Sequence, residues 1–193
     1  MKKIAMVITR QLCAGLNIST EQYDACQYGI ETLLHTIVST AGLLSIGICF
    51  HMFPETLIIV LVFYINQTLG GGFHASSHLK CFTTMSLFLI FGLCSCMLPQ
   101  ILQLDICLSI VSAIILYRIP LVLHTNKQYL IEKNTFFVRR SRITIGLWVC
   151  IVMVCIATQS IFFRAFTIGL VLSAVSRIYA KHMSSLKKRR NSY

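Results

Sequence analysis

Apolar residues dominate this chain in long runs, which are separated by short polar connections. A run of about 17–25 mainly apolar residues can cross the hydrocarbon core of a bilayer as one helix. Six runs approach this length, and the second and third are close to its lower limit. They cover residues 30–50, 54–70, 82–98, 105–123, 143–159 and 161–179. The pattern therefore predicts an all-α polytopic membrane protein with six transmembrane helices.

Residues 1–16 follow a different pattern, in which apolar and polar positions alternate at helical spacing. Ile4, Val7, Ile8, Leu12 and Leu16 recur on one face, and a basic residue at position 10 interrupts any continuous apolar run. This arrangement favours an amphipathic helix that lies in the membrane interface over a cleaved signal peptide.

Polar and turn-forming residues mark the other boundaries. Ser19 and Gln22 have the spacing of a capping box, so we expect a second helix that continues from the surface into the first span. Pro54 marks a short outer turn, three glycines at 70–72 end the second span, and Pro99 closes the third. Without an internal repeat, residues 1–193 are interpreted as one integral membrane domain, with a basic tail at 180–193.

Composition and charge narrow the function classes. Hydrophobic residues make up 56% of the chain and charged residues 12%, with a mean hydropathy of +0.76, which excludes an ordinary soluble domain. The net charge of +11 does not indicate a nucleic-acid partner. If the N-terminus is cytoplasmic and the spans alternate, all the Lys and Arg residues except Arg164 fall on the cytoplasmic side. The positive-inside rule then places both termini inside, and anionic lipid headgroups are the expected partners of the basic clusters.

The cysteines do not suggest a metal or a disulfide framework. Seven of the nine lie in apolar stretches, where cysteine behaves as a small hydrophobic residue. No paired CxxC spacing is present, so neither a metal nor another cofactor is predicted. The remaining two, Cys26 and Cys81, face the reducing cytoplasm in the predicted topology, where structural disulfides are not expected.

One polar connection carries residues suited to catalysis, "GGGFHASSHLKC" at 70–81. Cys81 stands at the start of the third span beside a lysine, and both the helix N-terminus and the cation stabilise a thiolate. His74 is about 10 Å away along a regular helix, so contact requires the chain to fold back, as Gly71 and Gly72 permit. His78 lies one turn before Cys81 and would reach it on a regular helix.

Simpler interpretations stand beside this one. A cysteine at a helix start is often only a small buried residue, and a histidine in a loop is often solvated. The glycines also suit a turn or a close helix contact. Ser76 and Ser77 are alternative nucleophiles, but no GxSxG-like elbow surrounds them, so we interpret them as turn residues.

"GGFHASSHLKC" resembles the GGxHA-x5-C signature of the AgrB family, the membrane cysteine endopeptidases of Gram-positive quorum sensing. "IPLVLHTNKQYL" at 119–130 is similar to that family's Pro–His–Asn–Lys segment, and "YGIETLL" at 28–34 resembles its opening span. Length, hydropathy and the order of these features agree over nearly the whole chain. The first motif is specific, and the other two are weaker.

The resemblance implies a role for each matching residue. Cys81 would attack a peptide bond of a short AgrD-like propeptide and form a thioester, with His74 as base and then acid. An internal Cys or Ser of the substrate would attack that thioester and release a cyclic thiolactone or lactone. The resemblance also implies the bacterial cell membrane, a homodimer, and a propeptide with an acidic tail. The basic region that includes Lys127, Arg139 and Arg140 would attract that tail.

The chain departs from the resembling family just before the glycines. That family carries an arginine there, whereas this chain has Asn66 and Gln67. Backbone N–H groups of the glycine loop, which includes Gly71 and Gly72, or of the start of the third span are then candidates to stabilise an oxyanion. Gln67 is a candidate supporting residue. Glu31, near the inner end of the first span, is a candidate to orient His74, or it reaches the headgroup region.

Other charged residues carry weaker expectations. Asp105 is interpreted as an ordinary span end, and Arg164 is expected to snorkel outward. A peptide transporter is the alternative function, but it predicts polar residues spread along several spans at mid-membrane depth. A non-catalytic scaffold, in which Cys81 and His74 are replaceable, is a further alternative.

Overall fold

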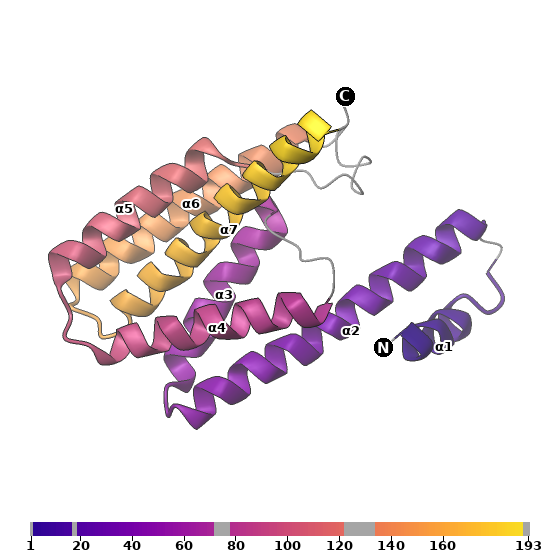
Figure 1. Cartoon of the computed structure of the whole chain (residues 1–193), viewed down its shortest axis with the longest axis horizontal. Coiled ribbons are helices and arrows are strands. Elements are labelled where there is room, and N and C mark those ends of the chain that lie inside the picture. The colour runs from indigo at the N-terminus through magenta and orange to yellow at the C-terminus, as the bar shows by residue number, and fades with distance from the viewer. Residues whose placement is uncertain (1, 17–18, 72–77, 122–133, 191–193) are drawn as a thin grey trace. The chain divides into compact units, whose positions relative to one another are not determined.

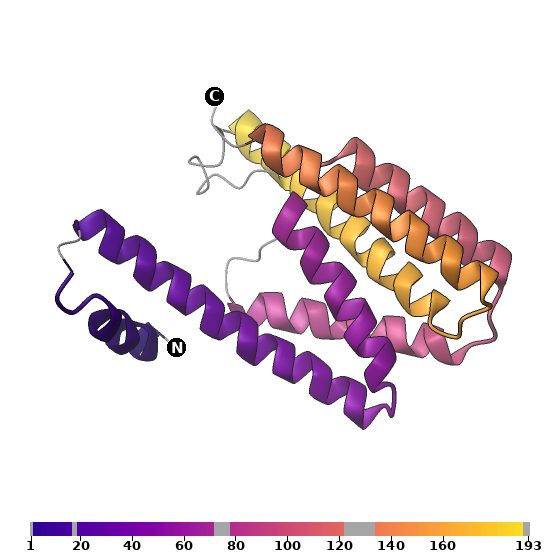
Figure 2. The same cartoon turned by 180° about the vertical axis from the view of Figure 1, so that it is seen from behind.

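The computed structural model describes residues 2–16, 19–71, 78–121 and 134–190, and these residues are helical apart from short turns. The helices are α1 (Lys2–Leu12), α2 (Thr20–Cys49), α3 (Phe53–Gly70), α4 (His78–Met97), α5 (Leu102–Arg118), α6 (Asn134–Ala157) and α7 (Phe163–Arg190). Figures 1 and 2 show their course from two sides. The chain divides into two compact units, Met1–Ser45 and Ile46–Tyr193.

Five of these helices are long and apolar enough to cross a membrane by length and composition. They are α2, α3, the Leu79–Met97 part of α4, the Thr135–Ala157 part of α6 and the Phe163–Met183 part of α7. α5 has 17 residues, which is at the short limit of the roughly 17–25 that span a bilayer. The protein is therefore an all-helical, multi-pass membrane protein in its described part. The count of six spans and the side on which the termini lie stay predictions.

The smaller unit contains the predicted capping box. The Ser19 backbone N–H donates to Gln22 Oε1 at 3.0 Å, and the Gln22 N–H donates to Ser19 Oγ at 3.3 Å. This reciprocal pair starts α2, which then continues to Cys49 without a break. The expected amphipathic helix over 1–16 is shorter, because α1 ends at Leu12 and Gly15 adopts a φ of +86°.

The larger unit is a bundle around α7. The contacts between neighbouring helices show that α3, α5 and α7 run in the same direction. They also show that α4 and α6 run in the opposite direction. The core of the bundle includes Val62, Leu116, Ile145, Trp148 and Leu170. Large apolar side chains such as Leu147, Met153 and Val154 stay exposed on the outside of α6. An exposed apolar surface of this kind suits a lipid environment.

Two helices end at other positions than the predicted spans. The span at 105–123 ends early, because α5 stops at Arg118 and the next residue has non-helical dihedrals. Pro120 explains this stop, since proline lacks an N–H and disfavours a helical conformation in the residue before it. α7 continues beyond residue 179 to Arg190, so the first part of the predicted basic tail is helical, and the end of the last span stays a prediction.

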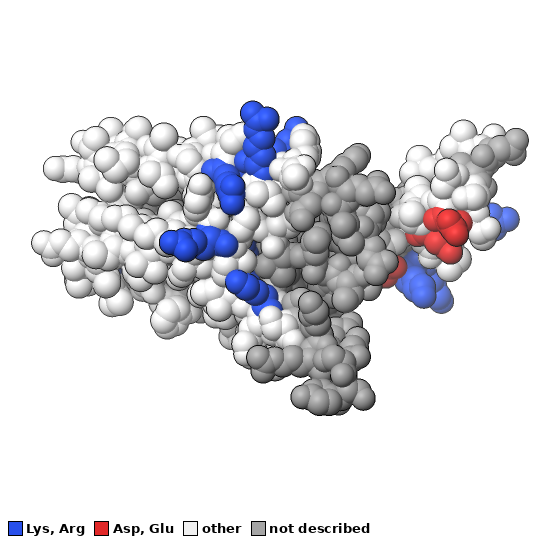
Figure 3. Space-filling model, turned by 90° about the horizontal axis from the view of Figure 1, so that it is seen from above, with Lys and Arg blue, Asp and Glu red and all other residues white. Residues whose placement is uncertain are grey.

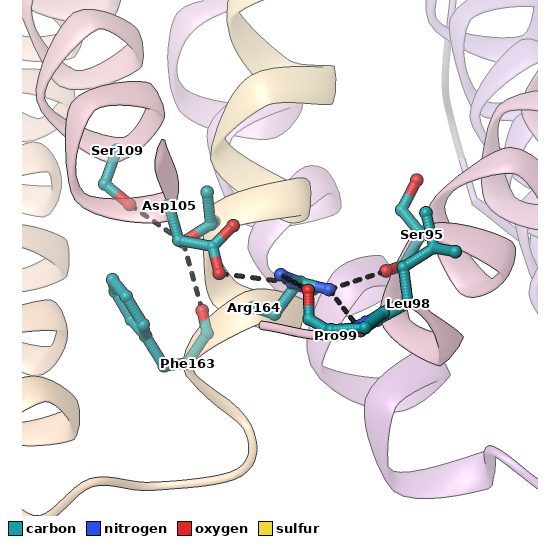
Figure 4. Close-up of polar contacts among 8 residues, drawn as sticks. Ser95, Leu98, Pro99, Asp105, Ser109, Phe163 and Arg164 are labelled. Atoms are coloured by element: carbon teal, nitrogen blue, oxygen red, sulfur yellow. Dashed lines mark hydrogen bonds and ion pairs between the residues drawn. The ribbon is translucent and has the colours of Figure 1, made fainter. Parts of the chain in front are cut away.

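Arg164 does not snorkel outward, and Asp105 is not an ordinary span end. The two form an ion pair, with Arg164 Nε 3.1 Å from Asp105 Oδ2. Arg164 Nη1 also donates to the carbonyls of Ser95 (2.9 Å) and Leu98 (2.7 Å), and its Nη2 donates to that of Pro99 (2.9 Å). Figure 4 shows how these groups converge from α4, α5 and α7. We call this set the Arg164 clasp.

The Arg164 clasp has a local cause in the sequence. In a regular helix, the carbonyl of Ser95 would accept from the N–H of residue 99, but Pro99 has none. The Leu98 N–H donates to this carbonyl instead, in a long contact of 3.3 Å. Water is scarce inside a membrane, so a carbonyl without a donor is costly there. The guanidinium of Arg164 supplies a donor to this carbonyl and also to the carbonyls of Leu98 and Pro99.

Candidate functional site

Cys81 lies in the first turn of α4, and its side chain is half-buried. All nine cysteines are free thiols. Burial raises the pKa of the Cys13 thiol, and a hydrogen bond with Cys26 raises it further. Cys13 is therefore a poor nucleophile near neutral pH.

Several candidate residues fall outside the described residues, so their placement stays a prediction. They are His74, Gly72 and Lys127. His78 begins α4, three residues before Cys81. Glu31 is half-buried in α2 and belongs to the smaller unit, so its proposed role toward His74 also stays a prediction.

The end of α3 has a defined geometry. The Gly71 N–H donates to the Gln67 carbonyl at 3.0 Å, and Gly71 has φ +68° and ψ −177°. Residues with a side chain rarely adopt this backbone conformation. The chain therefore leaves α3 at Gly71 in a conformation that favours glycine, and the predicted fold-back of the segment toward Cys81 stays a prediction.

Gln67 faces α7 in the described structure. Its Nε2 donates to Ser176 Oγ at 2.6 Å, while its buried Oε1 accepts no hydrogen bond from the described residues. A side chain held in this way fixes the last turn of α3 against α7. Its predicted contribution to an oxyanion site stays a prediction.

Arg177 of α7 is the functional candidate that sequence reasoning missed, because it was counted only as a topology determinant. Its side chain is 1% exposed. Nη2 donates to the Asn66 carbonyl of α3 at 2.9 Å. Nη1 donates toward the carbonyls at the end of α5, those of Leu116 (3.2 Å), Ile119 (3.0 Å) and Pro120 (3.4 Å). We call this set the Arg177 clasp.

The Arg177 clasp leaves no room for a side chain at Gly70. A Cβ atom there would overlap the guanidinium group. Among the described acidic residues, none forms an ion pair with Arg177, in contrast to Arg164. A buried cation in a membrane-spanning segment is costly and therefore marks a candidate functional residue.

Basic side chains of the described residues gather on α6 near its start and at the end of α5. Arg139 and Arg140 are exposed on α6. The guanidinium of Arg140 lies 4.1 Å from the ring centroid of Phe136, and that of Arg142 lies 5.1 Å from the ring centroid of Tyr117. Figure 3 shows basic side chains on the described surface of the larger unit. Its described acidic residues occupy the first turns of α3 and α5, at the opposite helix ends.

Comparison with known proteins identifies the family. The sequence profile of the family described as "Accessory gene regulator B" matches residues 1–177. The chain belongs to the accessory gene regulator B family. The match covers α1 to α6 and α7 as far as Arg177, so it includes both clasps and the segment from Gly70 to Cys81.

Curated relatives agree with this assignment. The chain is 28% identical over 81 residues to "Putative AgrB-like protein 2" of Clostridium perfringens (strain 13 / Type A). It is 27% identical over 81 residues to "Putative AgrB-like protein" of Clostridium perfringens (strain SM101 / Type A). Each alignment covers 42% of this chain and 38% of the relative. No solved structure matches the chain.

The geometry at Gly71 generates a stability prediction. We expect Gly71→Ala to destabilise the protein by about 1–3 kcal/mol, because alanine is strained at this φ and ψ. Gly146→Ala is the matched control, because its new Cβ meets open space on α6 and alanine favours a helix by roughly 0.5–1 kcal/mol. Thermal unfolding in detergent measures both. Equal stability of the two variants would contradict the described geometry at Gly71.

Proposed function

We propose that this protein is a membrane-embedded cysteine endopeptidase that trims and cyclises a short AgrD-like propeptide. The observation that carries the proposal is the family match over residues 1–177, which includes the "GGFHASSHLKC" segment. Family membership associates the chain with the processing of autoinducing peptides. The position of Cys81 in the first turn of α4 supports its assignment as the nucleophile.

The proposed reaction has two acyl-transfer steps. Cys81 Sγ attacks the scissile carbonyl carbon, and the C–N bond breaks as His74 delivers a proton to the departing amine. A thiol or hydroxyl group of the same peptide then gives its proton to His74, attacks the thioester carbonyl carbon, closes a ring and releases the Cys81 thiolate. A thioester retains the free energy that direct hydrolysis of the amide would lose. Ring closure can therefore follow, provided that water is kept away from the intermediate.

The proposed side of the reaction is the cytoplasmic face of the bacterial cell membrane. The exposed cations on α6 support this placement through the positive-inside rule. The same cations, Arg139 and Arg140 with Lys127, are the proposed receptor for an acidic propeptide tail. The contact of Arg140 with Phe136 restricts its side chain, which lowers the entropy that it loses on binding.

Mass analysis of a co-expressed propeptide tests the reaction. We expect the wild type to yield a trimmed product that is one water lighter than the linear acid, because the ring forms without hydrolysis. Cys81→Ala and His74→Ala should leave the propeptide intact. Cys94→Ala, which removes an exposed thiol from the same helix, should process it normally.

Three other outcomes would count against the proposal. A linear trimmed product would show a peptidase without ring closure. Processing that survives Cys81→Ala would exclude the nucleophile. An intact propeptide that leaves wild-type cells would favour the transporter.

Substrate recognition by the basic residues gives a separate prediction. We expect Arg139→Gln together with Arg140→Gln to raise KM about tenfold at low salt, because the two cations attract the acidic tail. The value of kcat should stay close to that of the wild type. A propeptide whose tail carboxylates are replaced by amides is the matched control, and it should bind both proteins equally. An unchanged KM for the acidic tail would show that it is recognised elsewhere.

A further inference from the structure

Two helix ends of the bundle, which precede two segments of the proposed site in the sequence, are held by one buried side chain. Residues 72–77, which include His74, follow directly after Gly71 at the end of α3. Residues 122–133, which include Lys127, follow directly after residue 121, just beyond the end of α5. Arg177 donates hydrogen bonds to carbonyls at both of these helix ends. One guanidinium therefore links the ends of α3 and α5, which precede the proposed catalytic and substrate-binding segments in the sequence.

The end of α3 is held by two neighbouring residues of α7. Arg177 binds the Asn66 carbonyl, and Ser176 accepts from the Gln67 side chain. Gly70 lies against the guanidinium, where a Cβ would not fit. These contacts fix Asn66, Gln67 and Gly70 near the end of α3, so the direction in which the chain leaves α3 depends on them.

The end of α5 depends on Arg177 for a different reason. In a regular helix the Leu116 carbonyl would accept from the N–H of residue 120, which is a proline and has none. Arg177 Nη1 provides a donor to this carbonyl and to those of Ile119 and Pro120. Loss of the guanidinium would leave the Leu116 carbonyl without a side-chain or helical donor in a buried position.

We propose that Arg177 is a positioning residue for the peptidase, which holds the end of α3 so that His74 reaches Cys81. This inference rests on the proposed function and adds to it a residue distant in sequence from the motif. Arg177 does not touch the reacting atoms in this role. It acts through the backbone of Asn66 and through Gly70.

The pH dependence of Cys81 alkylation separates positioning from general stability. A His74 imidazolium next to Cys81 favours the thiolate, so a formed pair makes Cys81 reactive at lower pH. We expect Arg177→Met to slow alkylation of Cys81 about tenfold at pH 7 and to move its profile up by about one pH unit. The value of kcat for propeptide cleavage should fall similarly, with little change in KM. Site-resolved mass spectrometry of the full-length protein in detergent follows Cys81 alone.

Variants of the chain provide matched controls. Arg177→Lys keeps the charge but has one ammonium in place of the planar fork, so it should restore only part of the rate. Gly70→Ala, which displaces the guanidinium, should move the profile in the same direction as Arg177→Met. Arg164→Met removes the other clasp of α7 at the opposite end of the bundle. It should lower thermal stability but leave the Cys81 profile of the folded protein unchanged.

Two results would overturn the inference. One is that folded Arg177→Met and Arg177→Lys show the same pH profile of Cys81 alkylation as the wild type. The other is an equal shift in Arg164→Met, which would show general loosening of the bundle. Failure of the proposed function would instead appear in the wild type, which would not cleave the propeptide. The two failures are therefore distinguishable.

Discussion

A carbonyl four residues before a proline has no helical donor, and inside a membrane water cannot replace that donor. This constraint arises at the ends of α4 and α5, before Pro99 and Pro120. An arginine of α7 meets it in each case. Arg164 donates to the carbonyls of residues 95, 98 and 99, and Arg177 donates to those of residues 116, 119 and 120. The two sets have the same spacing relative to their prolines.

The two arginines are 13 positions apart on α7, or about 20 Å along a helix, so they fasten opposite ends of the bundle. Their electrostatic surroundings differ. Arg164 is neutralised by Asp105 at 3.1 Å, whereas the described partners of Arg177 are backbone carbonyls on α3 and α5. Desolvating a guanidinium without a carboxylate partner is expensive. The proposed positioning role at the ends of α3 and α5 would explain why the chain bears this cost.

Patterns of neighbouring residues predicted much of this structure. Contacts between residues that are far apart in the sequence could not be predicted in this way. The reciprocal pair of Ser19 and Gln22 and the turn at Gly71 follow from neighbouring residues, so their sequence signals were sufficient. The ion pair of Arg164 with Asp105 joins residues 59 positions apart, and hydropathy carries no information about such pairing. A useful signal was present, because a cation within an apolar span requires partners, and Pro99 and Pro120 each lack the N–H that would bind the carbonyl four residues earlier. The catalytic roles of His74 and Cys81 came from the family resemblance, because spacing alone left their contact open.

A double-mutant cycle on Arg177 and Pro120 tests most directly whether the guanidinium replaces the donor that proline lacks. Pro120→Ala restores an N–H for the Leu116 carbonyl, so Arg177→Met should destabilise the protein less in this background than in the wild type. We expect a coupling free energy of about 0.5–3 kcal/mol from unfolding in detergent. Additive effects of the two substitutions would contradict the account, because they would show that Arg177 and Pro120 act independently.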